Sequence, residues 1–466
     1  MVNPNILSQR YTTKKINEIF SEEGRILAER ELWIAVMKAQ QELGLDIPSE
    51  EIIRYEQAKT DMNLNRINEI EKITRHDVKA KIEAFVEAAG AQEHIHKGMT
   101  SRDLTDNVEQ MQFKKASQII FGKYISILRH FLDKAKEYPQ TITSRTHHQP
   151  AQPTILGRRF SMWAEELYFN LEIFEDFLKN YPLRGIKGPV GTQADLLALL
   201  GDERKVEILE EKVANLLGFQ KTLSSPGQVY ARSLDYQLVS QLSFLSSSCE
   251  NFALTMRLMA GSELVTEGFK EGQTGSSAMP HKMNTRSSER ICGLGKIIKG
   301  YQDMVSRLSG DQWEEGDVSC SVIRRVALPD SFYAADGLCE TTLTILNEMG
   351  IYPKLIEAEL NKYLPFLATT KILMAAVKSG YGREQAHEII KRHAVQEALK
   401  MREGEQENLI NLLSEEFKGI DICAAVRDTG SLLGNAYRQI EKIVEKTGPL
   451  LRRYSQEAAY EPEEII

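Results

Sequence analysis

The segment 270–289 concentrates residues that could carry out acid–base chemistry beside a bound anion. Ser276 and Ser277 present hydroxyl groups within a glycine-containing run, and Lys282 and Asn284 follow shortly after them. Glycine reaches backbone conformations closed to other residues, so this segment could fold over a small ligand and exclude water. A nearby cation and amide can stabilise negative charge as it develops. The order of residues therefore predicts a catalytic loop, although glycine and serine are also typical of a polar linker between helices.

A second polar run, Thr-His-His-Gln-Pro-Ala-Gln-Pro at 146–153, stands just before a long apolar pattern. Neighbouring side chains such as His147 and His148 point apart, and no further ligand follows at metal-binding spacing, so we expect no metal here. A histidine ahead of a helix could be an inert cap, and local chemistry favours that interpretation. Proton transfer near neutral pH is the functional alternative.

Two shorter motifs could bind a carboxylate. Arg75, His76 and Asp77 stand in a row, and Thr100 and Ser101 close a Gly-Met-Thr-Ser run. Taken alone, the first motif is typical of a surface ion pair worth about 0–1 kcal/mol. Hydroxyl groups in loops are equally common, because they bond to nearby backbone.

Helical periodicity sets how these motifs must be positioned. Near the start, apolar residues recur at helical spacing in segments 25–43, 49 onward and 64–73. We therefore expect a small helical domain over residues 1–103.

Longer apolar patterns follow, and we expect helices over 107–138, 156–178, 234–259, 286–309 and 328–349. Long helices of matching length are typical of an antiparallel bundle. The sequence therefore predicts an all-α fold, with a helical-bundle domain over 104–351 that carries the loop 270–289. Shorter segments interrupted by glycine and proline predict a C-terminal helical domain over 352–466.

Composition narrows the class of protein. The 466 residues carry a net charge of −8 without a basic tail, which argues against nucleic acid as a partner. Five dispersed cysteines indicate reduced thiols in a cytoplasmic protein rather than a disulfide framework. The start lacks a signal-peptide core, and no apolar run approaches the roughly 18 residues of a membrane span, so we expect no membrane partner.

The order Gly-Ser-Ser-x-x-Pro-x-Lys-x-Asn at 275–284 resembles the signature loop of the fumarase/aspartase superfamily. Within it, Ser-Ser-Ala-Met-Pro-His-Lys at 276–282 is most similar to the adenylosuccinate lyase family, and Met-Asn-Thr at 283–285 resembles one bacterial branch of it. Thr-His-x-Gln-Pro-Ala-Gln at 146–152, Arg-His-Asp at 75–77 and Gly-x-Thr-Ser at 98–101 resemble further signatures of that family. The resemblance covers nearly the whole chain.

The resemblance implies catalytic roles for matching residues. Ser276 would be the base and His147 the general acid, with Glu289 as the carboxylate partner of that histidine. Lys282 would stabilise negative charge, and His76 would be a further catalytic group. Substrate would be bound by Arg10, Tyr11, Arg75, Asp77, Thr100, Ser101, Gln228, Asn284, Arg290, Ser321 and Arg325. The reaction calls for no metal or other cofactor.

The resemblance also implies a three-domain, mainly helical subunit and a homotetramer built around a central bundle of long helices. Active sites would be shared, with the Ser276 loop, His147 and His76 contributed by different subunits. The family eliminates fumarate from adenylosuccinate, giving AMP, and from SAICAR, an earlier purine intermediate, giving AICAR. The alternatives are another lyase of the superfamily, a non-catalytic helical scaffold, or a nucleotide-binding regulator, which would lack any phosphate-binding glycine loop here.

One position departs from the family pattern. Gly316 stands where much of the family has an arginine that binds phosphate. We expect another cation, such as Arg324, or backbone donors to take over that contact.

Overall fold

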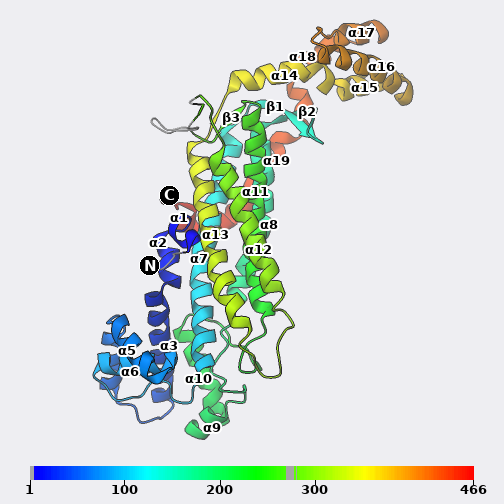
Figure 1. Cartoon of the computed structure of the whole chain (residues 1–466). Helices are drawn as coiled ribbons and strands as arrows, with labels where there is room; N and C mark the ends of the chain where they lie inside the picture. The colour runs from blue at the N-terminus through cyan, green and yellow to red at the C-terminus, as the bar shows by residue number, and fades with distance from the viewer. Residues whose placement is uncertain (1–4, 269–277, 280, 466) are drawn as a thin grey trace.

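Helices dominate the computed structural model, which describes residues 5–268, 278–279 and 281–465. Figure 1 shows an elongated subunit with a central set of long helices, small helices at one end and a separate helical cluster at the other. The expected all-α fold is confirmed, with short strands as an addition. Of the described helices, none is both long and apolar enough to cross a membrane.

The N-terminal part of the chain is helical. Its helices are α1 (Ile6–Arg10), α2 (Lys14–Phe20), α3 (Glu22–Glu42), α4 (Ser49–Ala58), α5 (Leu64–Thr74) and α6 (Asp77–Ala89). Local chemistry starts them: Ser21 accepts a hydrogen bond from the Gly24 backbone at the start of α3, and Asn63 does the same for Arg66 at the start of α5. Trp33 and Phe85 stack in the core between these helices.

Long helices form the centre, as the sequence predicted. They are α7 (Ser101–Glu137), α8 (Leu156–Asn180), α11 (Ser233–Gly261), α12 (Arg286–Ser306) and α13 (Cys320–Glu348). Their apolar faces meet in one cluster that includes Phe131, Phe160 and Phe252. Thr100 and Asp103 cap the start of α7 reciprocally, with Asp103 Oδ2 accepting from the Thr100 backbone at 2.8 Å. α7 therefore begins rigidly at the Gly-Met-Thr-Ser motif.

A β-hairpin joins α7 to α8, in a segment where no strand was predicted. β1 (Thr141–Thr146) pairs antiparallel with β2 (Gln149–Ile155). A small second pair, β3 (Val265–Thr266) and β4 (Gly350–Ile351), lies near the same end of the bundle. Between α8 and α11 lie α9 (Ala194–Leu200) and α10 (Glu203–Leu216), and α10 contributes Leu209 to the N-terminal apolar cluster.

The C-terminal part begins with α14 (Pro353–Leu367) and continues through α15 (Thr369–Lys378), α16 (Arg383–Arg402), α17 (Leu409–Glu416), α18 (Ile422–Arg427) and the 3-10 turn η1 (Gly430–Leu433). α15 to α18 share a core of their own, with Ile372 and Phe417 at its centre. α19 (Ala436–Arg453) and α20 (Ser455–Ala458) return to the bundle. The division near residues 103 and 351 stays a prediction.

Candidate active site

A small cavity lies where α6, α7 and α13 begin. Its volume is about 160 Å³. The predicted binding residues Asp77, Ser101, Ser321 and Arg325 line it, together with Arg25, Arg102, Val78, Thr105 and Glu109. The structure thus brings together side chains from positions 77 to 325, which the sequence connected only by resemblance.

Arg102 is one of the lining residues that sequence reasoning missed. Its Nη2 donates to Ser321 Oγ at 2.8 Å, and its Nη1 donates to Asp106 Oδ1 at 3.2 Å. The Arg102 side chain is 15% exposed, whereas that of Asp106 is fully buried. Asp106 lies one helical turn beyond Arg102 on α7, and this spacing was the available signal.

Buried arginine side chains hold Asp106 in its charged form. Arg232 Nη2 donates to Asp106 Oδ2 at 3.1 Å, and Arg324 Nη1 lies 3.8 Å from Asp106 Oδ1. Burial alone would raise the pKa of Asp106, but the guanidinium groups of Arg232, Arg324 and Arg102 outweigh it and hold that pKa below its usual value. The carboxylate is therefore a fixed anchor for Arg102.

Arg324 itself does not fit the phosphate role suggested for it. The residue is 2% exposed. Its Nε donates to Asp235 at 2.7 Å, its Nη1 to Glu109 at 2.5 Å and its Nη2 to the Tyr230 hydroxyl at 2.6 Å. Because carboxylates and a phenol already occupy its donors, Arg324 is a structural cation, and that expectation is wrong.

The backbone at Gly316 explains why this position has no side chain. A Cβ added there would lie 2.8 Å from Gln228 Cβ, closer than real Cβ contacts. The Gln228 backbone amide in turn donates to Glu315 O at 2.7 Å. Gln228 and Gly316 are thus packed together, and an arginine at 316 would displace Gln228.

Tyr11 lies beside another predicted binding residue, Arg290. Arg10 ends α1 and is exposed, and the Arg290 guanidinium lies 5.6 Å from the centre of the Tyr11 ring. A Cβ at Gly337 would lie 2.1 Å from the Tyr11 carbonyl oxygen, so the backbone at Tyr11 packs directly on α13. We call residues 10–13 the N-terminal arm; its Thr13 amide donates to Asp336 Oδ2 at 2.6 Å.

Arg75 and His76 form the joint between α5 and α6. Arg75 has a left-handed φ of 52° and ends α5, and His76 Nδ1 accepts from the Lys79 amide at 3.3 Å at the start of α6. Both side chains are exposed. When neutral, His76 therefore carries its proton on Nε2, which leaves that N–H for a partner outside the helix.

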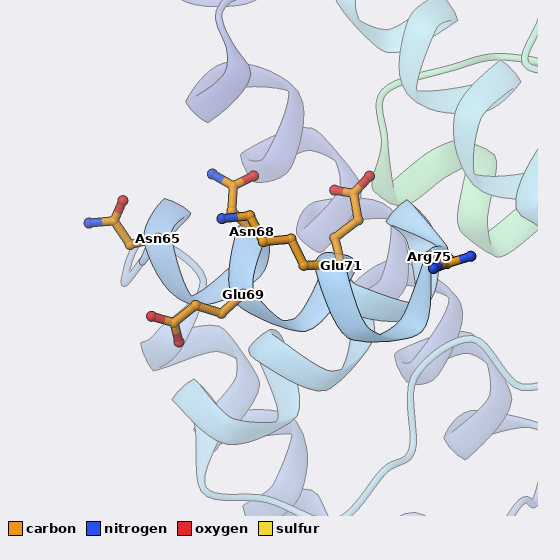
Figure 2. A pocket seen from close by; sticks show the side chains of 6 residues that line it. Asn65, Asn68, Glu69, Glu71 and Arg75 are labelled. Carbon is orange, nitrogen blue, oxygen red and sulfur yellow. The ribbon is translucent and has the colours of Figure 1, made fainter.

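A broad hollow along α5 ends at Arg75 but lacks the character of a site. It is lined by Asn65, Asn68, Glu69, Glu71, Lys72 and Arg75. Figure 2 shows these side chains fanning out along one helix, with Asn65 and Arg75 at opposite ends, instead of converging on a point. The hollow is the solvated face of α5.

His147 and His148 form the tip of the β1–β2 hairpin. Their φ values are 51° and 58°, and the flanking residues Thr146 and Gln149 pair with each other. Consecutive positive φ values are typical of a tight hairpin turn, and among residues other than glycine they are most frequent for asparagine, aspartate and histidine. Both histidines are exposed. The helix-cap interpretation of His147 is therefore wrong, because a strand precedes it and a strand follows it.

The hairpin is tied to the C-terminal part. Arg145 on β1 forms an ion pair with Glu359 on α14, and Gln152 Nε2 on β2 donates to Thr370 Oγ1 at 2.9 Å. These contacts fix the direction in which the tip projects.

The predicted signature loop is described only in part. Ser276 and Ser277 lie outside the described residues. Lys282 and Asn284 line a second cavity of about 450 Å³, whose other walls include Glu267 and Tyr352. The Glu267 carboxylate accepts from the backbone amides of residues 287 and 288 at 2.8 and 2.9 Å, which anchors the start of α12 at the end of the loop.

Glu289 lies on the first turn of α12 and is exposed. Its Oε1 lies 4.0 Å from Arg257 Nη2. Its predicted pairing with His147 stays a prediction. Within the described ranges, no group of histidine, cysteine and acidic side chains is arranged to hold a metal ion.

Comparison with known proteins identifies the family. A sequence model of the lyase family matches residues 9–300, and one for the adenylosuccinate lyase C-terminus matches residues 365–443. The adenylosuccinate lyase of Saccharomyces cerevisiae is 36% identical over 94% of this chain and 93% of its own. The chain belongs to the adenylosuccinate lyase family. It is therefore an enzyme, a lyase of the fumarase/aspartase superfamily.

Other relatives agree with this assignment. The adenylosuccinate lyase of Bacillus subtilis is 32% identical over 83% of this chain and 88% of its own. Among solved structures, a 3-carboxy-cis,cis-muconate lactonizing enzyme from Pseudomonas putida aligns with a TM-score of 0.83 at 18% identity, covering 97% of this chain and 100% of that one. A fumarate lyase from Mesorhizobium aligns with a TM-score of 0.79 at 19% identity, covering 94% and 99%. At such identities these structures show the fold alone.

Proposed function

We propose that this chain eliminates fumarate from adenylosuccinate, giving AMP, and from SAICAR, giving AICAR. The match of residues 365–443 to the adenylosuccinate lyase C-terminus carries this proposal. The fold cannot carry it, because a muconate lactonizing enzyme shares that fold.

The chemistry follows from the predicted roles. A base removes a proton from the carbon next to a substrate carboxylate, the carbon–nitrogen bond breaks, and an acid protonates the departing nitrogen. Ser276 is the proposed base, and Lys282 and Asn284 would stabilise the negative charge that builds on the carboxylate. His147 is the proposed acid, a role typically worth 10²–10⁴-fold in rate. Its exposed place at a hairpin tip suits a group that must reach into another molecule.

The length of α7 supports active sites shared between subunits. Ser101, in the cavity, is its first residue, and the hairpin begins at Thr141, shortly after its last. Its 37 residues span about 55 Å. A two-stranded hairpin of this size, roughly 20 Å long, cannot bridge that distance. His147 therefore cannot reach the cavity of its own subunit, and we propose that it serves the cavity of another copy of the chain.

Exposed apolar side chains on the bundle support assembly into a homotetramer. They lie at Met162, Phe169 and Ile173 on α8, at Phe244, Leu254 and Leu258 on α11, and at Ile297 and Met304 on α12. Several of these residues recur at helical spacing, so they form stripes rather than scattered points. Such apolar surface is typical of a subunit interface. We also propose a cytoplasmic location and retain the likeness of 283–285 to a bacterial branch as a prediction.

The deciding experiment is a stopped assay that quantifies fumarate and AMP formed from adenylosuccinate by the purified protein. We expect equal amounts of both, and at least about a hundredfold less in Ser276→Ala. Full activity in Ser276→Ala would refute the role of the serine, and absence of fumarate with the native protein would refute the function.

Shared sites can be tested separately by mixing variants. Ser276→Ala and His147→Gln should each be inactive, and dissociation and reassembly of the mixture should restore activity if one site draws the two residues from different subunits. A mixture that stays inactive after confirmed subunit exchange would refute the shared arrangement.

A further inference from the structure

The cavity at the starts of α6, α7 and α13 has the chemistry of an oxyanion site. Arg25, Arg102 and Arg325 are among the residues that line it, together with Ser101 and Ser321, whose hydroxyl groups can act as donors. Helix starts carry partial positive charge, so their convergence adds to the attraction for an anion.

Carboxylates in the lining do not cancel this charge. Glu109 already pairs with the buried Arg324 guanidinium at 2.5 Å. Asp77 has an exposed side chain beside His76, with 3.8 Å between Asp77 Oδ1 and His76 Nδ1. Arg25 pairs with the buried Glu29 at 3.4 Å, and Arg102 pairs with the buried Asp106 at 3.2 Å. Lys81 also pairs with Glu29, and Arg232 also pairs with Asp106, so these shared carboxylates neutralise the arginines of the lining only in part.

The size of the cavity fits one charged group. Its volume of about 160 Å³ is well below the roughly 300–1,000 Å³ of pockets that enclose a whole small molecule. A phosphate or carboxylate group fits, and a nucleotide does not. The cavity is thus one part of a larger site, the part that fixes an anionic end.

Arg102 is oriented for such a ligand before the ligand arrives. One nitrogen of its fork is bonded to the buried Asp106 and the other to Ser321 at the cavity wall. Asp106 is itself fixed by Arg232 at 3.1 Å. A guanidinium held in this way loses little freedom on binding and presents its remaining N–H groups in a fixed direction, as a phosphate requires.

We propose that Arg102, with Ser321, binds the 5′-phosphate of the nucleotide substrate. This inference rests on the proposed function. It assigns the phosphate contact to the first turn of α7 and answers how the site manages with Gly316, where packing against Gln228 leaves no room for a side chain.

The test measures binding of AMP, adenosine and fumarate by titration calorimetry, with the assembled enzyme and its Arg102→Gln and Arg102→Lys variants. Loss of charge-assisted hydrogen bonds should weaken AMP binding by about 10–100-fold in Arg102→Gln. Arg102→Lys should recover part of that loss, because a charge remains without the fork. Binding of adenosine and of fumarate should stay within about threefold of the native protein.

The matched control is Arg307→Gln, which removes an arginine whose side chain is 75% exposed and which pairs only with Asp303 at 3.6 Å among the described contacts. AMP binding by this control should not change. If Arg102→Gln does not fold, as thermal unfolding would show, Ser321→Ala is tested instead, with a smaller loss of AMP affinity expected.

Two outcomes would overturn the assignment: AMP affinity within threefold of native in Arg102→Gln and Ser321→Ala, or a loss of fumarate affinity alone, which would make the cavity a carboxylate site. Either result with normal turnover by the native enzyme leaves the proposed function standing. A native enzyme that neither binds AMP nor releases fumarate would refute both.

Discussion

Replacing Lys123 by methionine should destabilise the subunit strongly, because it leaves buried carboxylates without their cation. Lys123 lies near the middle of α7 with a side chain 3% exposed. Its Nζ forms ion pairs with Asp336 and, at 2.7 Å, with Glu340, and neither carboxylate is exposed. Burial opposes the lysine charge, but Asp336 and Glu340 outweigh it and raise the pKa of Lys123.

The magnitude follows from this geometry. At 2.7 Å and an effective dielectric constant of about 20, a single pair attracts by roughly 6 kcal/mol, of which burial offsets a large part. Removing one partner of a buried pair typically costs about 3–5 kcal/mol. An unfolding entropy of about 2.1 cal/mol/K per residue over 466 residues converts this loss to a Tm lowered by about 3–5 °C, if the subunit unfolds as one unit.

The loss should also depend on pH. Burial raises the pKa of Glu340 above its unfolded value, and Lys123 opposes that rise. Without Lys123 the pKa of Glu340 rises further. A carboxyl whose folded pKa is raised favours folding when it is protonated, and that contribution is lost as the pH rises from the unfolded value through the folded one. The Tm difference between native and Lys123→Met protein should therefore be larger at pH 8 than at pH 5.

Differential scanning calorimetry at both pH values measures this effect. Lys115→Met, at an exposed lysine of the same helix, is the control and should change stability by less than about 0.5 kcal/mol. A Tm lowered by less than 1 °C in Lys123→Met, or an equal difference at both pH values, would show that the buried charges are not the source of the stability.

Two further substitutions test local geometry. His148→Gly should relieve the left-handed backbone at the hairpin tip, so we expect it to stabilise the protein by about 0.5–1 kcal/mol and to keep kcat within about twofold. His147→Gly should instead lower kcat by 10²–10⁴-fold, because it removes the proposed acid. Equal losses of kcat in both variants would mean that the turn, and not the imidazole of His147, matters. Gly316→Arg should collide with Gln228 and lower stability by about 1–3 kcal/mol, measured by chemical unfolding, and a stability equal to the native one would contradict the packing described at this position.

Helices could be predicted from sequence because their signal is local. The apolar repeat that places Phe131 and Phe252 in the core is visible within a single segment, and α7, α8 and α11 begin and end close to where that repeat does. The hairpin could not be predicted in the same way. Pro150 and Pro153 lack the amide that a strand donates, which argues against a strand, yet an edge strand tolerates them.

The same distinction between local and distant signals applies to the site residues. Motifs matched to a family could be named from sequence, including Ser101 and Ser321, which the structure brings to one cavity. Arg102 was missed because its partners, apart from Asp106, lie far away in sequence, with Ser321 219 residues along the chain. Arg324 was assigned wrongly for the same reason: a sequence shows a charge but not the carboxylates that already occupy it.

The buried cluster around Lys123 links parts of the chain that the active site needs in fixed places. Asp336 accepts hydrogen bonds from Thr12 at 3.0 Å and Thr13 at 2.6 Å, which directly follow Tyr11 in the N-terminal arm. Glu340 accepts from the Tyr460 hydroxyl at 2.8 Å, so the C-terminal tail closes over the same charges. A methionine at 123 would leave these carboxylates to repel each other. The N-terminal arm, which is bonded to Asp336, should therefore be displaced, whereas the hairpin, which is bonded to the C-terminal part, should keep its position. Lys123→Met should therefore raise KM for adenylosuccinate more than it lowers kcat, whereas a fall in kcat alone would mean that the cluster stabilises the bundle without positioning the arm.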